Sequence, residues 1–207
     1  MILLDLEGTT TPISFVHDVL FPYARARLAV DTADHAALQA EYECDRDHDR
    51  PGTFEPKAYA LWLMDRDRKS TALKALQGKL WRRGYEGGEL RSVVFDDVPR
   101  ALARWHDGGR TIAIYSSGSI EAQQLLLRYS NHGDLTPYVS HYFDTTTGPK
   151  REAASYRAIG TGTFISDILE ELEAARDGGF TGVLSIRPGN APVADHAFQT
   201  IRTFDHV

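Results

Sequence analysis

The hydrophobic pattern of this chain changes in style about halfway along. From residue 93 onward, short apolar runs alternate with segments in which apolar residues recur at helical spacing. The apolar runs predict strands at 111–115, 139–143, 163–166 and 183–186. The segments of helical spacing predict helices at 99–106, 120–130, 151–159 and 170–176. This alternation predicts a parallel sheet with helices on both faces, in which ligands bind at the carboxyl ends of the strands.

The part of the chain before residue 93 follows another pattern. Residues 1–4 are an apolar run that predicts a first strand. Helical spacing then runs from 17 to about 44 and again from 56 to 85, with a polar loop at 45–55 between them. Pro22 is expected to start or kink a helix, because its ring is not accommodated in a helix interior. The interruption predicts a helical cap inserted after the first strand.

The predicted fold is therefore α/β, with a Rossmann-like parallel sheet core, helices on both faces and an inserted α-helical cap. The predicted core domain comprises residues 1–12 and 91–207, and the predicted cap domain comprises residues 13–90. A length of 207 residues is sufficient for one core that carries a smaller insert.

The first predicted strand ends in two carboxylates, Asp5 and Glu7, followed by Gly8 and three threonines. Side chains two positions apart on an extended segment point to the same side, so the two carboxylates are expected to converge. Gly8 permits a close backbone approach, and the N–H groups and hydroxyls after it suit an anion. Two acids beside a phosphate require a divalent cation between them. The pattern predicts metal-assisted phosphoryl chemistry with Asp5 as nucleophile; an acidic helix cap is the alternative.

Polar residues also follow later predicted strands. Ser116 and Ser117 open a helix and predict a phosphate cradle, or else an ordinary serine cap. Lys150 lies in the loop after the next strand, where it could neutralise phosphate oxygens and hold the nucleophile, or else be a solvated surface lysine. Asp167 ends a further strand and could supply another oxygen ligand to Mg²⁺. Since strand ends of a parallel sheet cluster, one pocket is expected to hold all of these groups.

Composition narrows the classes of partner and the compartment. A hydrophobic content of 42% and a charged content of 25% are typical of a soluble globular protein. The net charge of −6 argues against a nucleic acid or an anionic membrane as partner. A single cysteine, Cys44, excludes an internal disulfide and suits a reducing compartment. We expect no signal peptide and no membrane span, and we predict a cytoplasmic protein.

Asp5, Glu7, the Ser116-Ser117 pair, Lys150 and Asp167 together resemble the four motifs of haloacid dehalogenase-superfamily phosphatases. Glutamate at the second acid position is less usual in that superfamily. Longer runs of sequence are similar to the enolase-phosphatase (acireductone synthase) family of methionine salvage, over essentially the full length. These runs occupy residues 5–25, 67–78, 115–119, 142–156 and 187–190. The segment from Lys150 to Asp167 is shorter than is usual in that family.

The resemblance implies a bifunctional, Mg²⁺-dependent monomer that acts on a small phosphorylated molecule. Such an enzyme enolises 2,3-diketo-5-methylthiopentyl-1-phosphate and then removes the phosphate to give 1,2-dihydroxy-3-keto-5-methylthiopentene. By motif, Asp5 is the nucleophile and Glu7 serves as acid and base. The metal ligands implied are Asp5, Glu7 (in part through its backbone carbonyl) and Asp167. The substrate-binding residues implied are Ser116, Ser117 and Lys150, of which Lys150 is also catalytic.

Three other functions remain open at this point. A generic phosphatase of the same superfamily shares the motifs but not the long runs or Glu7. A phosphate-sensing or scaffold protein on this fold would be expected to have lost Asp5, Lys150 or Asp167, and all three are present. A dehalogenase would not need the Mg²⁺ ligands, so dependence on a metal separates it from a phosphatase.

Several other residues have less specific patterns. Asp45, Asp47 and Asp49 imitate a calcium loop but lack its glycine and its final glutamate, so we interpret them, like the charged stretch 65–69, as a solvated surface. Glu171 lies one helical turn beyond Asp167, where it could hydrogen-bond waters on a metal or simply begin a helix. We expect core positions for Trp62, Trp81 and Trp105. We expect Phe15 and Val16, at the entry to the cap, to contact the methylthio group.

Overall fold

The core is a six-stranded parallel sheet with the strand order β3-β2-β1-β4-β5-β6. The computed structural model describes residues 1–68 and 70–207, so Lys69 of the charged stretch lies outside the described residues. The strands are β1 (Ile2–Leu4), β2 (Ile112–Tyr115), β3 (His141–Phe143), β4 (Gly162–Ser166), β5 (Phe180–Ser185) and β6 (Gln199–Ile201). The strand order reverses at β1 and β4, and the crevice at such a switch point is where α/β sheets bind ligands.

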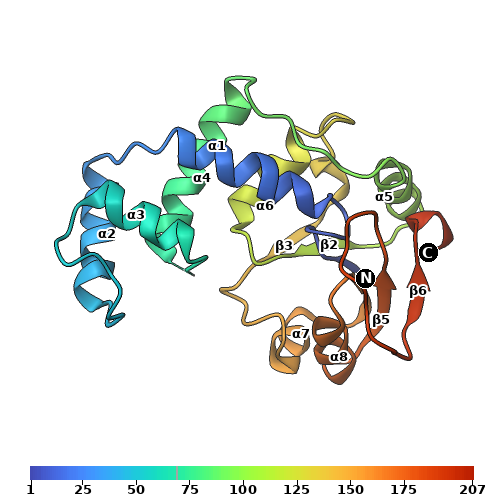
Figure 1. The fold of residues 1–207 in the computed structure, drawn as a ribbon. Helices are drawn as coiled ribbons and strands as arrows, with labels where there is room; N and C mark the ends of the chain where they lie inside the picture. The colour runs from blue at the N-terminus through green and yellow to red at the C-terminus, as the bar shows by residue number, and fades with distance from the viewer. Residues whose placement is uncertain (69) are drawn as a thin grey trace.

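Helices cover both faces of this sheet, as predicted (Figure 1). One face packs against α5 (Val98–Asp107) and α6 (Ile120–Arg128), and the other against α7 (Ala153–Ile159) and α8 (Leu169–Asp177). The alternation of side chains along β1 explains the two cores: Ile2 and Leu4 belong to the α5 side, and Leu3 to the α8 side. A strand buried on both faces is uniformly apolar, which is why the run at residues 1–4 predicts it.

A block of helices between β1 and α5 lies to one side of the sheet (Figure 1). It consists of η1 (Phe15–Leu20), α1 (Phe21–Ala26), α2 (Thr32–Cys44), α3 (Pro56–Asp65) and α4 (Thr71–Glu86). Helices α1 to α4 share an apolar cluster that includes Leu38, Tyr59 and Leu76. A second cluster, which joins Phe15 of η1 to Leu125 of α6, connects this block to the sheet domain. The domain boundaries at 12/13 and 90/91 stay a prediction.

The structure differs from the predicted elements where polar side chains start and stop helices. Each long helical region is split in two, because Asp31 and Ser70 accept first-turn N–H groups and so begin α2 and α4. Asp67, with φ of 45°, adopts the left-handed conformation in the turn between α3 and α4. Pro22 lies in the first turn of α1, as expected. Strand β6 and the short 3₁₀ turns η2 (Thr136–Tyr138) and η3 (Phe204–His206) were not predicted.

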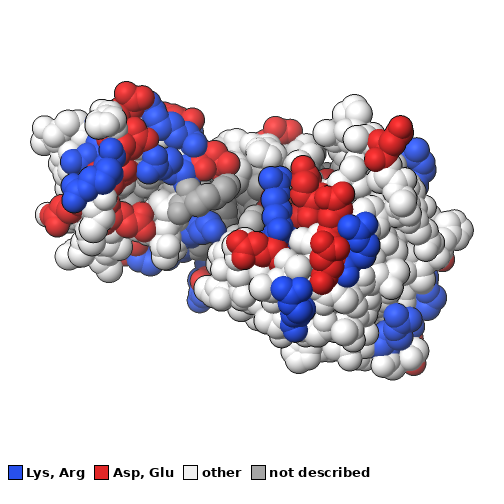
Figure 2. Space-filling model, turned by 90° about the horizontal axis from the view of Figure 1, so that it is seen from below, with Lys and Arg blue, Asp and Glu red and all other residues white. Residues whose placement is uncertain are grey.

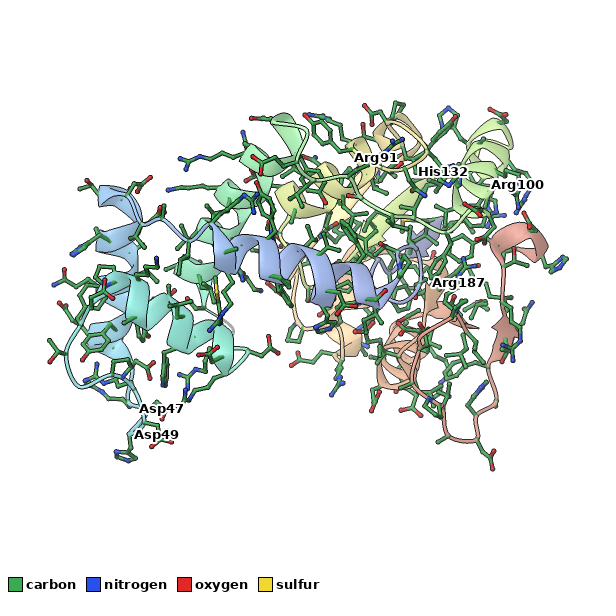
Figure 3. The ribbon with its side chains drawn as sticks, turned by 45° about the horizontal axis from the view of Figure 1, so that its top comes forward. Asp47, Asp49, Arg91, Arg100, His132 and Arg187 are labelled. Carbon is green, nitrogen blue, oxygen red and sulfur yellow. The ribbon has the colours of Figure 1, made fainter. Side chains whose placement is uncertain are left out.

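The prediction that the acidic loop between α2 and α3 is a solvated surface is wrong for Asp45, whose side chain is buried. Its carboxylate accepts a hydrogen bond from the Tyr59 hydroxyl at 3.0 Å and pairs with Arg68 at 3.2 Å. Figure 3 places Asp47 and Asp49 at the end of the molecule farthest from Arg187. The predicted core positions of Trp62 and Trp105 are confirmed, whereas Trp81 is half-buried.

The surface carries charges of both signs. On the face shown in Figure 2, acidic and basic side chains are interspersed over both parts of the molecule. Among the described residues, none of the helices combines the length and the apolar character that crossing a membrane requires.

Candidate active site

All six predicted site residues line one cavity of about 110 Å³ at the carboxyl ends of the strands. The residues are Asp5, Glu7, Ser116, Ser117, Lys150 and Asp167, and the cavity is completed by Ile13, Ile168 and Glu171. The sheet brings them together because Leu4 of β1 is in register with Ile114 of β2 and Ile165 of β4. The residues that follow these positions therefore emerge at the same edge.

Asp5, Lys150 and Glu171 form a buried ion cluster on the floor of this cavity. The Lys150 ammonium lies 2.6 Å from Asp5 Oδ1 and 2.7 Å from Glu171 Oε2. Burial opposes the charge on Lys150, but the two carboxylates outweigh it and raise the pKa of that ammonium above its ordinary value. Burial, and then the charge of Asp5, raise the pKa of Glu171 to about 7. The alternative of a solvated surface lysine is therefore wrong.

Three hydroxyl groups hold the backbone on which Lys150 lies. Tyr115 donates to the carbonyl of Gly148, Ser155 to that of Pro149 and Tyr156 to that of Lys150, each at 2.8 Å. Three consecutive carbonyls are thus held by donors from β2 and α7. The shorter connection from Lys150 to β4 therefore leaves the lysine firmly positioned.

The turn after Asp5 is organised differently from the predicted anion-binding turn. The N–H groups of Thr9, Thr10 and Thr11 all donate to the carbonyl of Leu6. The threonine hydroxyls donate to Asp167 Oδ1, to the carbonyl of Asp5 and to the carbonyl of Val93, respectively. These groups shape the loop and are occupied within the protein, so the prediction that they bind an anion is wrong.

The second predicted phosphate site retains free donor capacity. Ser116 lies just beyond β2, and its hydroxyl accepts a hydrogen bond from the N–H of Gly118 at 3.1 Å. A hydroxyl that accepts a hydrogen bond can still donate its own hydrogen to a ligand. Ser119 begins α6 by accepting from the N–H of Ala122. Ser116 and Ser117, in the turn that leads into α6, line the cavity, and the dipole of that helix favours an anion near its N-terminus.

Comparison with known proteins places this geometry in a family. No protein-family model matches the chain. An enolase-phosphatase of Synechococcus elongatus is 49% identical, over the whole chain and 96% of that relative. The chain belongs to the enolase-phosphatase family. It is an enzyme of methionine salvage on the haloacid dehalogenase fold, with the phosphatase and enolase activities from which the family takes its name.

Other similarities support the family and the fold. A bifunctional methylthioribulose-1-phosphate dehydratase/enolase-phosphatase of Vitis vinifera is 44% identical, over 98% of the chain and 45% of that longer protein. The crystal structure of the Unknown transcript 4 protein of Saccharomyces cerevisiae superimposes with a TM-score of 0.81 at 33% identity, over 100% of the chain and 99% of that protein. A haloacid dehalogenase-type hydrolase of Bacillus subtilis bound to magnesium, 14% identical, matches the fold with a TM-score of 0.59 over 99% and 95% of the two chains.

The oxygen donors of this enolase-phosphatase fit a hard cation such as Mg²⁺. Asp5 and Asp167 line the same cavity, and burial together with the charge of Asp5 raises the pKa of Asp167 to about 7. Gly8, whose φ is 75°, allows the loop backbone to lie against the Asp167 carboxylate. A Cβ at this position would lie only 2.3 Å from Asp167 Oδ2. No three acidic, histidine or cysteine side chains converge as a preformed metal cage in the described ranges 1–68 and 70–207. Mg²⁺ does not need one, since it commonly uses one or two carboxylates with waters and substrate phosphate.

Two expectations about neighbouring residues change with the structure. Phe15 and Val16 are buried in the cluster between η1 and α6 and are not among the residues that line the cavity, whereas Ile13 is. Glu171 is a member of the ion cluster: besides Lys150, it accepts from the Ser166 hydroxyl at 3.0 Å. The spacing of one helical turn between Asp167 and Glu171 indicated in the sequence that Glu171 could lie near the site. Its contact with Lys150 joins two segments that are remote in sequence, so no local pattern could predict that contact.

Proposed function

We propose that this enzyme converts 2,3-diketo-5-methylthiopentyl-1-phosphate into 1,2-dihydroxy-3-keto-5-methylthiopentene and phosphate, by enolisation followed by phosphate transfer to Asp5. The observation that carries the proposal is the Asp5 carboxylate held at 2.6 Å by a buried lysine, in a cavity that also presents Ser116 and Ser117. An ionised carboxylate is already a nucleophile and needs no base to activate it.

Asp5 would attack the phosphorus while the bond from phosphorus to the substrate oxygen breaks. The Leu6 N–H at 2.8 Å and the Lys150 ammonium both bond to Asp5 Oδ1, and so fix the carboxylate for attack. Ser116, Ser117 and Lys150 would hold the phosphoryl oxygens. Water then cleaves the aspartyl phosphate, which releases phosphate and restores Asp5.

Glu7 is the residue proposed to move protons. Its side chain lines the same cavity as Asp5 and is one methylene longer than the aspartate more usual at this position. That length suits it to protonate the substrate oxygen as the phosphorus–oxygen bond breaks and to serve as acid or base during enolisation.

Asp5 and Asp167, with the backbone carbonyl of Glu7, would hold Mg²⁺. When bound there, the ion would supply positive charge that offsets the two carboxylates and the phosphate and acidifies the carbon beside the carbonyl. The single positive charge of Lys150 is shared between Asp5 and Glu171, so a metal ion would add the further positive charge that a bound phosphate requires.

The chemistry of the Vitis vinifera relative supports the substrate proposed. That protein joins a methylthioribulose-1-phosphate dehydratase to an enolase-phosphatase. Loss of water from the vicinal diol of a 2-keto sugar phosphate gives an enol, and the enol becomes a 2,3-diketone. A dehydratase of this kind therefore produces the diketo phosphate that the present enzyme would consume.

Phosphate release from the diketo phosphate, measured with Mg²⁺ and after its removal by a chelator, tests the proposal. We expect turnover with Mg²⁺ and its loss without the metal. A panel of sugar phosphates and phosphoglycolate serves as the control. Faster turnover of a panel member than of the diketo phosphate would show a general phosphatase instead.

We also propose that the enzyme is a cytoplasmic monomer whose partner is this small substrate. Light scattering of the purified protein tests the monomer: a mass near 23.1 kDa is expected, and twice that mass would show a dimer.

A further inference from the structure

We infer that Arg187 and Asn190 are positioning residues for the reaction, which hold from behind the loop that carries Asp5 and Glu7. They belong to the run Arg187-Pro188-Gly189-Asn190 that follows β5. Neither residue lines the cavity. The inference rests on the proposed function, because the loop that they hold is assigned its role there.

Arg187 contacts the loop from a buried position. Its Nε donates to the carbonyl of Thr9 at 3.0 Å. Its two terminal nitrogens form a bidentate pair with Asp97 at 3.0 and 2.9 Å. The guanidinium lies 4.6 Å from the ring centre of Phe95 and 4.5 Å from that of Phe204. Nη1 also donates to the carbonyl of Arg202 at 3.0 Å. A planar guanidinium can stack on two rings and bond to three partners at once, so the Thr9 carbonyl is held by a rigid group.

Asn190 holds the neighbouring carbonyl from the other end of the same turn. Its amide donates to the carbonyl of Gly8 at 2.9 Å. The turn is closed by a hydrogen bond from the N–H of Asn190 to the carbonyl of Arg187. Gly189, within the turn, adopts a φ of 90°. Two consecutive carbonyls of the catalytic loop are thus fixed by one short turn.

The orientation of these two carbonyls determines how the loop faces the cavity. Fixing the carbonyls of Gly8 and Thr9 fixes the Gly8–Thr9 and Thr9–Thr10 peptide planes, which follow Glu7 in the loop. It thereby holds Gly8 against Asp167, where a Cβ would lie 2.3 Å from the carboxylate. A displacement of about 1 Å in reacting groups can cost about 100-fold in rate. The turn therefore acts on catalysis through the loop, without touching the substrate.

Asn190→Ala is the decisive variant, because it removes only the hydrogen bonds of the side-chain amide, to the carbonyls of Gly8 at 2.9 Å and Ser185 at 3.4 Å, and leaves the Arg187–Asp97 pair intact. Tyr85→Phe is the matched control: it removes the buried hydrogen bond between Tyr85 and Ser92 at 2.6 Å, in the cluster beside α6. Both variants are compared for melting temperature, kcat and KM, with the diketo phosphate and with p-nitrophenyl phosphate. Arg187→Met and Arg187→Lys form a second pair, in which lysine keeps the charge and one donor.

For Asn190→Ala we expect kcat to fall at least about tenfold with KM within about threefold, while Tyr85→Phe with a similar loss of melting temperature keeps its kcat. Arg187→Lys should recover part of the kcat that Arg187→Met loses; if Arg187→Met does not fold, Asn190→Ala alone decides. A kcat within twofold of wild type in Asn190→Ala, or a fall no larger than in the control, would overturn the inference. Failure of the wild type on the diketo phosphate with turnover of p-nitrophenyl phosphate would instead reject the proposed substrate, and the comparison would continue on the second compound.

Discussion

At the scale of single residues, the candidate active site is organised around a lysine that two buried carboxylates share. Lys150 contacts Asp5 and Glu171 at 2.6 and 2.7 Å, and three hydroxyls fix its backbone. Breaking a buried ion pair leaves an uncompensated charge, so neither carboxylate is a neutral place for substitution. In the proposed mechanism, the cluster would both anchor Asp5 as the nucleophile and offer one cation to the phosphate.

Asp5→Asn should abolish phosphate release, by at least about 1000-fold, because an amide cannot form the aspartyl phosphate. The substitution is nearly isosteric, so the melting curve should remain a single cooperative transition. Phosphate release and circular dichroism on the same preparation check both expectations. Substantial phosphatase activity in this variant would remove Asp5 from the role of nucleophile.

Asp167 should make the metal-free protein less stable as pH rises. Burial and the charge of Asp5 raise its folded pKa to about 7, above the value near 4 of an unfolded aspartate. Between these values the folded protein holds a proton that the unfolded chain has lost, so the free energy of unfolding declines with increasing pH. We expect a fall of about 3 kcal/mol between about pH 5 and pH 8, because the folded carboxyl stays protonated over about two pH units of this range and one unit corresponds to about 1.4 kcal/mol.

Urea unfolding of the metal-free protein at both pH values measures this fall. Glu171 contributes a change of the same sign, so the difference between wild type and Asp167→Asn isolates Asp167. The variant should show the smaller pH dependence. An identical dependence in the two proteins would mean that Asp167 titrates normally.

At the scale of elements, the centre of the sheet could be predicted because β1 and β2 are buried along their whole length, β4 and β5 along most of it, and polar groups follow β1, β2 and β4. The register of β1 with β2 and β4 then brings Asp5, Ser116 and Asp167 together. Elements held by long-range contacts could not be predicted: β6 is a three-residue edge strand, and the contact of Glu171 with Lys150 joins two separate crossovers. The threonines after Gly8 were misassigned because their N–H groups bond to Leu6 within the loop, while the hydroxyl of Thr11 bonds to Val93 through a contact that is remote in sequence.

Ile13, just before η1, should contribute substrate specificity. This residue lines the cavity, so Ile13→Ala should lower kcat/KM about tenfold more on the methylthio substrate than on an analogue without the tail. Phe15→Ala is the control, because Phe15 is buried between η1 and α6 and should instead cost about 3–5 kcal/mol of stability. Equal losses on both substrates for Ile13→Ala would assign tail recognition to other residues.

At the scale of the whole molecule, both proposed reactions would take place in one cavity at the carboxyl ends of the strands. The cavity is small, about 110 Å³, and Glu7, Asp5 and Lys150 all line it. Both steps would therefore use the same bound substrate without release between them. The central claim is that enolisation comes first and that phosphate leaves from the enol.

Stopped-flow absorbance of the enol, recorded together with a coupled phosphate sensor after mixing with the diketo phosphate, tests this claim most directly. We expect the ultraviolet absorbance of a phosphorylated enol to rise first and phosphate to appear after a lag. We also expect Glu7→Asp to slow these steps by up to about 100-fold through misplaced proton transfer. Phosphate that appears before any enol absorbance would contradict the order of the two steps and leave a plain phosphatase.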